Sequence, residues 1–393
     1  MNIAVVGGAG HVGLPFCAVL ASVGHQVVAI DSDVYRIQLA RSGKSSFSEP
    51  GLDEILSAVI QLGYLTFESS LSAVRNSEVV VVVVGTDLTE QGLPQNDSVL
   101  RVVEELCDHL REGSTVVLRS TIMPGTTARV AAMLRHLQVE VAFCPERIAE
   151  GMAVEELRMI PQLIGSESSN APTRLRELFD SLGIEVLDLS WSEAELSKLI
   201  LNTWRYSQFA IANEFAIACE QYGVDFSSVR VSLLYKYPRG QGLMAPGFAG
   251  GPCLRKDTLQ LINGTTSSAE LFREVIASHD RMIPRVVNEV LQVLGSGKKT
   301  VVQLGISFKP GSDDLRGSVG LDLARALSTH VPKLIVVDPH VSNSELSLTM
   351  MGLDDALKVA DLIVVGTRHP EFRGLIVDVP VIDIAGQSFV TRG

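Results

Sequence analysis

Residues 8–13 read Gly-Ala-Gly-His-Val-Gly and fit the pattern G-x-G-x-x-G. The pattern follows Met1–Val6, an apolar stretch typical of a short buried strand, and it opens an apolar segment, typical of a helix, that ends near Gly24. The next strand pattern, Val27–Ile30, closes with Asp31, about 20 residues beyond the glycines. A strand, a glycine loop, a helix and a second strand that ends in an acidic residue predict the first half of a Rossmann-type dinucleotide-binding domain.

The glycine loop also indicates which cofactor this domain binds. Its glycines let the backbone turn tightly and approach a pyrophosphate, and the N-terminus of the following helix offers unpaired N–H groups. Asp31 would accept hydrogen bonds from the adenosine ribose and repel a 2′-phosphate, which favours NAD over NADP. A glycine-rich turn without a ligand is the competing interpretation, and a solvated helix arginine is the alternative for Arg36. The expected NAD residues are Gly8, Gly10, His11, Val12, Gly13, Asp31 and Arg36.

The remaining patterns predict an α/β protein. Val79–Val84 is a run of six β-branched residues, which suits a parallel strand covered on both faces. No Pro or Gly interrupts Glu193–Tyr222, which predicts one long helix, and Ser192–Glu195 has the sequence of a capping box. Other strand patterns lie before this helix and after a connector at residues 295–299, namely Thr115–Leu118, Val139–Phe143, Thr300–Leu304, Leu334–Val337, Leu362–Val365 and Val381–Asp383.

These patterns divide the chain into three parts. We expect an N-terminal Rossmann-type NAD domain at residues 1–190, a central long-helix region at residues 191–295, and a smaller, C-terminal Rossmann-like domain at residues 296–393. The long helix has more apolar residues than one domain junction needs. It is therefore expected to form the interface of a homodimer.

Composition and charge exclude several classes of protein. The 393 residues carry a formal net charge of -12, whereas a nucleic-acid-binding protein has a basic surface. The five cysteines are odd in number and lack metal-ligand spacing, so we expect neither a disulfide framework nor a metal site. The apolar runs are too short to span a membrane, and we see no signal-peptide pattern. These features predict a cytoplasmic protein with no nucleic-acid or membrane partner.

Two segments carry polar residues at spacings that suggest a catalytic or binding role. In Phe143–Gly151, Glu146 and Glu150 are two carboxylates that follow a strand and a proline, although the start of a solvated helix has the same pattern. Lys198 and Asn202 stand at positions i and i+4 and share one helical face, which would form an anion or oxyanion site if it lines a cleft. A lysine that only extends to water is the alternative.

A third segment, Ala245–Asp257, surrounds Cys253. This cysteine lies between a glycine loop and Lys256-Asp257, and nearby cations raise the thiolate fraction of a thiol. A buried, inert cysteine is the alternative, and it suits better the residues Cys17, Cys107 and Cys219. Cys253 is therefore the candidate nucleophile.

Through a larger set of ordered motifs, the chain resembles the UDP-glucose and GDP-mannose dehydrogenases over nearly its whole length. These motifs are Gly10–Pro15, Glu49–Leu52, Ser120–Thr126, Pro145–Arg147, Lys198 with Asn202, Ala212–Glu214, Gly250–Cys253 with Lys256-Asp257, Gly305–Pro310, Asp313–Arg316, Val337–Pro339 and Ala360-Asp361. The resemblance implies an NAD-dependent oxidoreductase of polysaccharide biosynthesis, a nucleotide-sugar 6-dehydrogenase. Such an enzyme oxidises the C6 hydroxyl of a nucleotide sugar to the uronic acid through a cysteine thiohemiacetal and thioester. It also implies that residues 296–393 bind a UDP-sugar.

The resemblance further implies roles for single residues. Cys253 would be the nucleophile of the second oxidation, and Lys198 and Asn202 would stabilise negative charge on the sugar oxygen. Asp257 and Thr121 would position the catalytic water, and Glu150 would assist proton transfer or thioester hydrolysis. Arg239 would reach the substrate site of the partner subunit. To the cofactor residues the resemblance adds Thr86, Thr121, Glu150, Lys256 and Arg316, and as substrate residues it gives Glu146, Lys198, Asn202, Arg239, Phe248 and Gly250.

Two other functions remain open from the sequence. A single-step NAD-dependent hydroxyacid dehydrogenase would need Lys198 but not Cys253. A catalytically silent NAD-binding sensor would need neither residue. Within the family that the chain resembles, the substrate is open among UDP-glucose, a UDP-N-acetylhexosamine and GDP-mannose.

Overall fold

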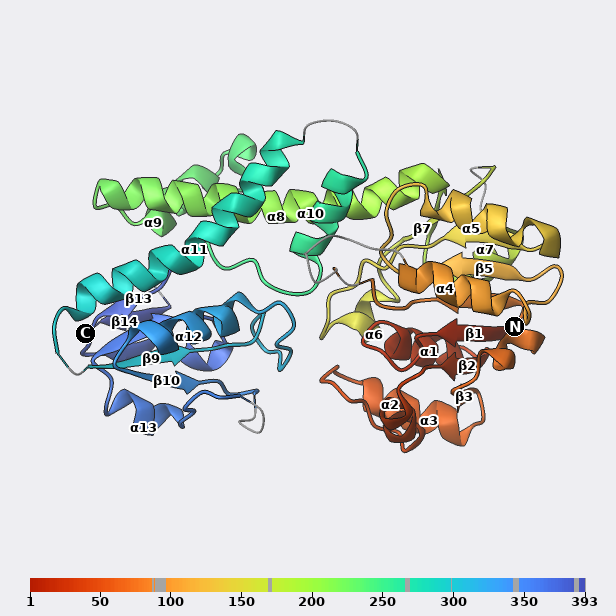
Figure 1. Cartoon of the computed structure of the whole chain (residues 1–393), viewed down its shortest axis with the longest axis horizontal. Coiled ribbons are helices and arrows are strands. Elements are labelled where there is room, and N and C mark those ends of the chain that lie inside the picture. Colours follow the sequence, from red (N-terminus) through yellow and green to blue (C-terminus); the bar gives the residue numbers. More distant parts are fainter. Residues whose placement is uncertain are drawn as a thin grey trace. The chain divides into compact units, whose positions relative to one another are not determined.

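The computed structural model describes residues 1–86, 88, 97–168, 172–265, 269–297, 299–341, 346–384 and 389–392. The chain forms two compact units (Figure 1). The N-terminal unit comprises Met1–Leu201 and Leu259–Thr266, and the C-terminal unit comprises Asn202–Thr258 and Ser267–Gly393. The three-part division at residues 190 and 295 stays a prediction. Lys298, part of the expected connector, lies outside the described residues.

The N-terminal unit is built on one sheet of eight strands. In sheet order these are β3 (Leu65–Glu68), β2 (Gln26–Ile30), β1 (Asn2–Val6), β4 (Val79–Val82), β5 (Thr115–Leu118), β6 (Glu140–Phe143), β7 (Gln162–Ser166) and β8 (Val186–Ser190). β6 and β7 pair antiparallel, and the other neighbours pair parallel. The order 3-2-1-4-5-6 of the first six strands is the Rossmann order, so the predicted fold class is confirmed.

Helices cover both faces of this sheet. Alternate residues of each central strand enter opposite cores: Val79 and Val81 pack on one side, Val80 and Val82 on the other. This two-sided burial is what the continuous valine run predicts. The strand ends at Val82, two residues before the run does. The helices of the unit are α1 (Gly13–Ser22), α2 (Val34–Arg41), α3 (Leu52–Gln61), α4 (Asp97–Leu106), α5 (Thr126–Leu134), α6 (Ala153–Glu156) and α7 (Thr173–Asp180), with short 3-10 turns at Leu71–Asn76 and Arg135–Leu137.

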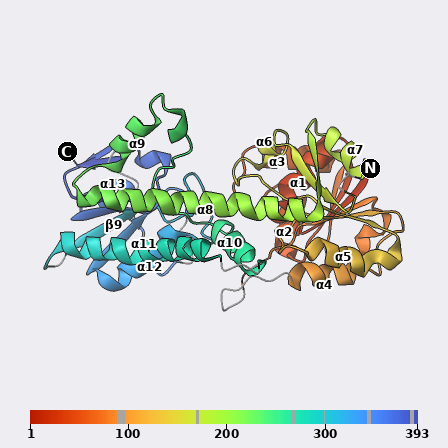
Figure 2. The same ribbon diagram turned by 90° about the horizontal axis from the view of Figure 1, so that it is seen from above.

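The long helix is α8 (Trp191–Gln221), a single helix of 31 residues that contributes to both units (Figure 2). It agrees with the expected Glu193–Tyr222 within two residues at each end. The capping box lies two residues earlier than predicted, because Ser190 and Glu193 form it. The Ser190 N–H and hydroxyl donate to Oε2 of Glu193 over 2.8 and 2.7 Å, and the Glu193 N–H donates to Oγ of Ser190 over 3.3 Å. Glu195 has a different partner, described below.

The C-terminal unit contains a parallel sheet in the order β10 (Lys333–Val337), β9 (Thr300–Leu304), β11 (Leu362–Val365) and β13 (Val381–Ile382). A second, two-stranded sheet pairs β12 (Leu375–Val377) with β14 (Val390–Arg392). The helices are α9 (Phe226–Leu234), α10 (Leu254–Asn263, shared with the N-terminal unit), α11 (Glu270–Leu294), α12 (Val319–His330) and α13 (Leu353–Leu357), with 3-10 turns η3 (Pro238–Gly240) and η4 (Pro370–Phe372). The strands predicted in this half are all present.

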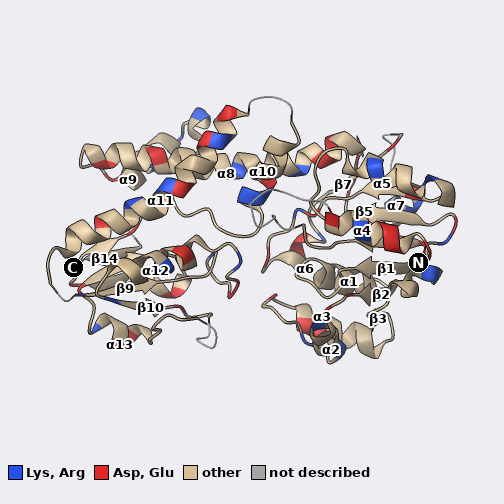
Figure 3. Ribbon diagram, in the orientation of Figure 1, with Lys and Arg blue, Asp and Glu red and all other residues tan. Residues whose placement is uncertain are grey.

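The helices of the C-terminal unit carry charges of both signs. Both acidic and basic residues lie along α11 (Figure 3). Arg285 of α11 forms an ion pair with Glu220 of α8, and Ser278 donates to the Glu214 carboxylate over 2.8 Å. These contacts hold α11 against the second half of α8. Among the helices that the structure describes, none is long and apolar enough to cross a membrane.

Candidate functional site

In the glycine loop between β1 and α1, the fold requires glycine at two positions and does not require it at a third. A Cβ on Gly13 would lie 2.1 Å from the carbonyl oxygen of Gly7, and a Cβ on Gly8 would lie 2.8 Å from Ala29 of β2. A Cβ on Gly10 would meet nothing closer than 3.4 Å. Packing therefore requires glycine at positions 8 and 13, whereas position 10 leaves open the space in which a pyrophosphate approaches the backbone. This arrangement fits a dinucleotide.

The N-terminus of α1 lies beside Asp31 at the end of β2. The Asp31 carboxylate accepts the N–H of Ala9 over 3.0 Å and the N–H of Asp33 over 3.0 Å, so it shapes the glycine loop. The first turn of α1 contains no acidic residue, and no side chain caps it. An uncapped helix N-terminus attracts an anion. The predicted residues Gly8, Gly10, Val12, Gly13 and Asp31 thus come together at one edge of the sheet.

The other predicted cofactor residues of the N-terminal unit lie on the loops around this edge. His11 stacks on Phe47, with ring centroids 4.3 Å apart. Arg36, on α2, forms an ion pair with Asp33 over 3.2 Å. The hydroxyl of Thr86 donates to the carbonyl oxygen of Thr121 over 2.8 Å, which joins the loops after β4 and β5. Thr86 and Thr121 are therefore adjacent, as a shared role in binding the cofactor requires.

The segment that carries Glu146 and Glu150 is fixed by buried charges. Arg119, whose side chain is 2% exposed, donates to the carboxylate of Glu146 and lies 4.2 Å over the ring of Phe16. The other carboxylate oxygen of Glu146 accepts the N–H of Ile148 over 2.9 Å. Glu146 therefore holds the loop in shape, in addition to any contact with substrate. Arg119 was not among the residues predicted from the sequence.

A second buried carboxylate fixes the chain just beyond Glu150. Glu49 accepts the N–H groups of Gly151 over 2.7 Å and of Ala153 over 2.8 Å. Glu49 belongs to a motif, Glu49–Leu52, for which the sequence analysis gave no role. Its contacts show that the motif supports the Glu150 segment.

Glu195 anchors the start of α8 to the N-terminus of α5. Its carboxylate, 1% exposed, accepts the N–H of Gly125 over 2.7 Å, the N–H of Thr127 over 2.8 Å and the Thr127 hydroxyl over 2.6 Å. A carboxylate at a helix N-terminus is stabilised by the unpaired N–H groups there. Lys198 follows Glu195 by about one helical turn, so this anchor fixes the part of α8 that carries Lys198.

Cys253 is the exposed one among the five cysteines. Burial raises the pKa of Cys144 to about 12 and the pKa of Cys17 further still, so both are inert thiols near neutral pH. Cys253 directly precedes α10. The glycine before it, Gly251, has φ of +96° and donates its N–H to the carbonyl oxygen of Gly317 over 2.8 Å. Residue 251 needs to be glycine because of this positive φ and because a Cβ there would lie 2.7 Å from the ring of Phe308.

Three other predicted residues of the C-terminal unit meet next to Cys253. The Asp257 carboxylate is fully buried, and it accepts from Nδ2 of Asn202 over 2.5 Å and from Nζ of Lys256 over 2.9 Å. The N–H of Asp257 donates to the carbonyl oxygen of Cys253 over 2.8 Å, which is the first hydrogen bond of α10. Asn202 and Asp257 are far apart in the sequence, and the fold brings their side chains into direct contact.

The C-terminal unit also contains a cavity of about 390 Å³. Phe248 and Gly250 line it, as predicted for substrate residues, and so does the whole stretch from Met244 to Gly250 that leads to Cys253. Three cations that the sequence analysis did not name as site residues also line it: Arg205, Lys309 and Arg368. A cavity with this size and charge suits a small anionic ligand.

Buried side chains fix the walls of this cavity. Asn213 forms two hydrogen bonds with the backbone of Gly247, of 2.8 and 3.1 Å. The guanidinium of Arg368 makes a forked ion pair with Asp383, whose side chain is 2% exposed, at 2.7 Å between Nη2 and Oδ2. Asn213 and Lys309 stand in motifs quoted from the sequence, so a signal for them existed. Arg368 has no such signal.

Two predicted residues lie elsewhere in the C-terminal unit. Arg239 is exposed on η3, and Arg316 forms an ion pair with Asp314 over 2.5 Å. Neither is among the described residues that line the cavity.

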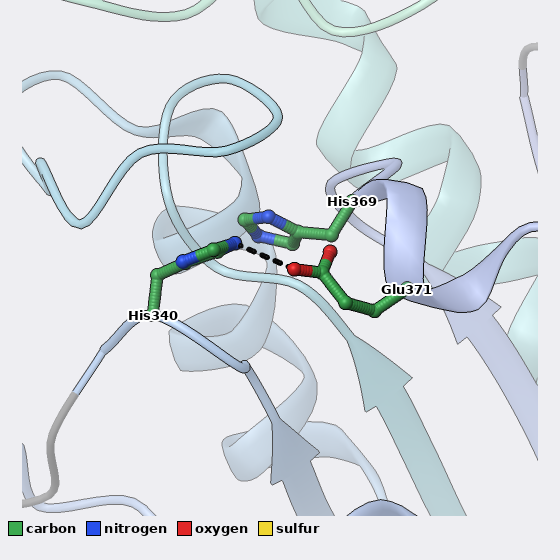
Figure 4. Close-up of side chains that lie close together, drawn as sticks. All are labelled: His340, His369 and Glu371. Carbon is green, nitrogen blue, oxygen red and sulfur yellow. Dashed lines mark ion pairs between the residues drawn. The ribbon is translucent and has the colours of Figure 1, made fainter. Parts of the chain in front are cut away.

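His340, His369 and Glu371 form a further cluster, in the loops after β10 and β11 (Figure 4). Nε2 of His340 lies 3.2 Å from a carboxylate oxygen of Glu371. Imidazole and carboxylate groups are metal ligands in many proteins. The expected absence of a metal stays a prediction, and the hydrogen bonds of His369 are considered below.

Comparison with known families matches three models to consecutive parts of the chain. All three describe the UDP-glucose/GDP-mannose dehydrogenase family: its NAD binding domain matches residues 1–183, its central domain residues 192–281 and its UDP binding domain residues 302–386. The glycine loop and Asp31 fall in the first match, Lys198, Asn202 and Cys253 in the second, and Lys309 and Arg368 in the third.

Individual relatives extend over nearly the whole chain. The chain is 33% identical over 405 residues to a UDP-glucose 6-dehydrogenase of Pseudomonas aeruginosa, covering 95% of this chain and 89% of the relative. It is 31% identical over 391 residues to a UDP-N-acetyl-D-mannosamine dehydrogenase of Pyrococcus horikoshii, covering 95% and 91%. The structure of a UDP-glucose dehydrogenase from Pyrobaculum islandicum is similar with a TM-score of 0.89 at 26% identity, covering 100% of this chain and 97% of that one.

Proposed function

The chain belongs to the UDP-glucose/GDP-mannose dehydrogenase family, and from this premise we propose that it oxidises the C6 hydroxyl of a UDP-hexose, such as UDP-glucose or a UDP-N-acetylhexosamine, to the carboxylate in two steps. That it is an NAD-dependent oxidoreductase acting on a nucleotide sugar follows from the family and its members, so the predicted cofactor and enzyme class are confirmed. The specific sugar, the covalent mechanism and the site residues are the proposed part.

The observation that carries the proposal is the continuity of the cavity wall with Cys253. The stretch Met244–Gly250 lines a cavity with three cations, and Cys253 follows within the same loop. Lys309, Arg205 and Arg368 would bind the diphosphate, and Phe248 and Gly250 would contact the sugar. Glu146 is retained as a proposed substrate residue that acts mainly through its loop.

The glycine loop, Asp31, Thr86, Thr121 and Arg36 would hold NAD in the N-terminal unit. We propose Lys256 and Arg316 as further cofactor residues. NAD supplies the two-electron acceptor for each of the two oxidations. Because Asp31 is an anion at the end of β2, it would repel the 2′-phosphate of NADP.

The proposed reaction assigns a role to each catalytic residue. In the first oxidation, C6 loses a hydride and its hydroxyl loses a proton to give an aldehyde, and the Lys198 ammonium and Asn202 amide stabilise negative charge on the oxygen. Asn202 has a second N–H for this purpose besides the one that it donates to Asp257. The Cys253 thiolate then adds to the aldehyde carbon, and the resulting thiohemiacetal alkoxide loses a second hydride to become a thioester.

Hydrolysis completes the reaction. Asp257 and Thr121 would position a water molecule, and Glu150 would accept its proton as the oxygen attacks the thioester carbon. The carbon–sulfur bond breaks, the thiolate of Cys253 leaves, and the carboxylate is released. The overall change consumes two NAD and one water per sugar.

The test is the yield of NADH per sugar in the wild-type and Cys253→Ser proteins. With a panel of UDP-glucose, UDP-N-acetylhexosamines and GDP-mannose, the wild type should give two NADH per molecule of its substrate. Cys253→Ser should slow acid formation by about 10² or more while substrate and NAD still bind, because a serine hydroxyl is barely ionised near neutral pH. The matched control Cys219→Ser changes a half-buried cysteine of the same unit and should retain activity.

The outcomes separate the competing functions. One NADH per substrate would favour a single-step dehydrogenase, and no NADH with any sugar of the panel would favour a silent NAD-binding sensor. Two NADH per sugar from Cys253→Ser at nearly the wild-type rate would disprove the covalent mechanism.

We also propose that the chain forms a homodimer through residues of the segment 191–295. Trp204, Ile211 and Phe215 of α8 are 56%, 44% and 48% exposed, and their spacing places them along one side of the helix. Exposed apolar side chains in one stripe favour a protein partner. Arg239 is proposed to act in the substrate site of the partner subunit.

A further inference from the structure

His369 connects the loops that follow β9, β10 and β11. Its ring is fully buried, and Nε2 lies 3.1 Å from Oδ2 of Asp338 and 3.1 Å from Oγ of Ser307. Its other nitrogen, Nδ1, accepts the N–H of Gly311 over 3.2 Å. One imidazole thus joins the loop after β9, at Ser307 and Gly311, to the loop after β10, at Asp338.

These contacts determine where the ring proton lies. The Gly311 N–H can only donate, so Nδ1 must be unprotonated, and Nε2 carries the proton and donates it to the Asp338 carboxylate. Figure 4 shows the ring facing His340 and Glu371. A metal ion at Nε2 would have to displace this proton, and the neutral ring would then carry its one proton on Nδ1, opposite the Gly311 N–H. The cluster is therefore better explained as a hydrogen-bonded anchor than as a metal centre.

The hydrogen bonds of His369 extend to residues that line the cavity. The Ser307 hydroxyl, which contacts His369, donates to the carbonyl oxygen of Lys309 over 2.9 Å. The hydroxyl of Thr367, two residues before His369, donates to the carbonyl oxygen of Ser307 over 2.5 Å. Ser307, Lys309 and Thr367 all line the cavity, whereas the ring of His369 does not. His369 can therefore influence a ligand only through the residues that it holds.

We propose that His369 is a positioning residue for the nucleotide sugar, which fixes Lys309 in the place where it contacts the ligand. The inference rests on the proposed function, in which this cavity binds the diphosphate. The backbone on both sides of Lys309 is held, at Ser307 by Asp338 and at Gly311 by His369. Without the imidazole, the lysine has to be ordered when the ligand binds, and that ordering weakens affinity.

The first experiment compares substitutions of His369 and His340. His369→Phe keeps an aromatic ring against Phe372, where the edge-to-face contact has a centroid distance of 5.7 Å, but it removes all three hydrogen bonds. It should raise the KM for the nucleotide sugar, and the Kd for UDP measured by calorimetry, about tenfold or more. The kcat and the KM for NAD should stay within about twofold. His369→Gln retains an N–H donor and an acceptor oxygen and should restore most of the affinity.

His340→Ala is the matched control, because it removes the other imidazole of the cluster and retains the backbone N–H that Asp338 accepts. It should leave UDP binding unchanged. An equal loss in His340→Ala and His369→Phe would contradict the inference, as would a loss of kcat with KM unchanged. Should His369→Phe fail to fold, Ser307→Ala cuts the same connection with a smaller change and should raise the KM in the same way.

A double-mutant cycle distinguishes this inference from the proposed function. If His369 acts through Lys309, then His369→Phe should weaken UDP binding by less than about twofold in a Lys309→Ala background. Fully additive losses would overturn the positioning role alone. UDP binding that is unaffected by Lys309→Ala would instead overturn the assignment of the cavity to the nucleotide.

Discussion

At the scale of single residues, the glycine loop divides its tasks between folding and binding. A Cβ at residue 13 would collide with Gly7, while a Cβ at residue 10 has room within the protein. We expect Gly13→Ala to lower the free energy of unfolding by about 1–3 kcal/mol. Gly10→Ala should fold normally and weaken NAD binding about tenfold, because its methyl group would occupy the space of the pyrophosphate. Thermal unfolding and NAD titration of both variants check this, and equal melting losses would contradict it.

Glu289 is a half-buried carboxylate without a role in the proposed reaction. Burial raises its pKa, the neighbouring Glu220 raises it further, and Arg285 only partly opposes them. A group whose pKa is raised in the folded state stabilises the fold below its unfolded pKa and loses that contribution as the pH rises through the folded pKa. Glu289→Gln should therefore stabilise the protein at pH 7, by about 0.5–1 kcal/mol, and the gain should vanish near pH 4. Urea unfolding at both pH values measures it, and a gain that persists in acid would argue against this account.

At the scale of elements, the anchor between α8 and α5 gives a matched pair of substitutions. Glu195 is buried against the N-terminus of α5, whereas Glu193, two residues away, caps α8 at the surface. Glu195→Ala leaves the N–H groups of Gly125 and Thr127 without their acceptor and should cost on the order of 3 kcal/mol. It should also lower kcat, since Lys198 is about one turn away. Glu193→Ala should change the melting temperature and kcat little, and a similar effect of both would disprove the anchor.

Elements with a strong local pattern were predictable from the sequence, and those defined by distant partners were not. The valine run of β4 and the uninterrupted α8 are apparent because their own residues determine them. β8, with the burial pattern of a half-exposed strand, carries Asp188 and gives a weak signal. The sequence S-x-x-E occurs at both 190 and 192, and only the packing of Glu195 on α5 decides which serine caps the helix.

The same limit applies to predicting the residues of the candidate site from the sequence. Cys253 was found from its glycine loop and the neighbouring Lys256-Asp257, and Asn202 from its spacing to Lys198. The family resemblance added a role for Asp257, and the fold brings these residues together. Arg368 was missed, since its place in the cavity depends on β11 lying beside β9 and on its ion pair with Asp383. Such a relation has no local pattern. Arg119 was missed for the same reason, because nothing in its own sequence neighbourhood indicates that Glu146 will be its partner.

At the scale of the whole molecule, the exposed stripe on α8 predicts the assembly. Phe215→Glu introduces a charge at one end of that stripe and should convert a dimer into monomers, as measured by sedimentation velocity. Leu62→Glu is the control, because Leu62 is equally apolar and 68% exposed but lies in the N-terminal unit, just after α3. If Arg239 serves the partner's site, the Phe215→Glu monomer should also lose activity. A wild-type protein that is monomeric and fully active would refute the dimer.

The hydrogen bonds of the Asp338 carboxylate limit solvent access to the loops that surround it. It accepts five hydrogen bonds, from the N–H groups of Ile306, Ser307, His340 and Val341 and from the ring of His369. Burial alone would raise its pKa, but these bonds outweigh burial and hold the pKa of Asp338 below its ordinary value. An amide exchanges its hydrogen for deuterium only when its hydrogen bond opens. These four loop amides should therefore exchange together and slowly, like those of a central strand, so that a nucleotide arriving at the cavity meets a rigid wall.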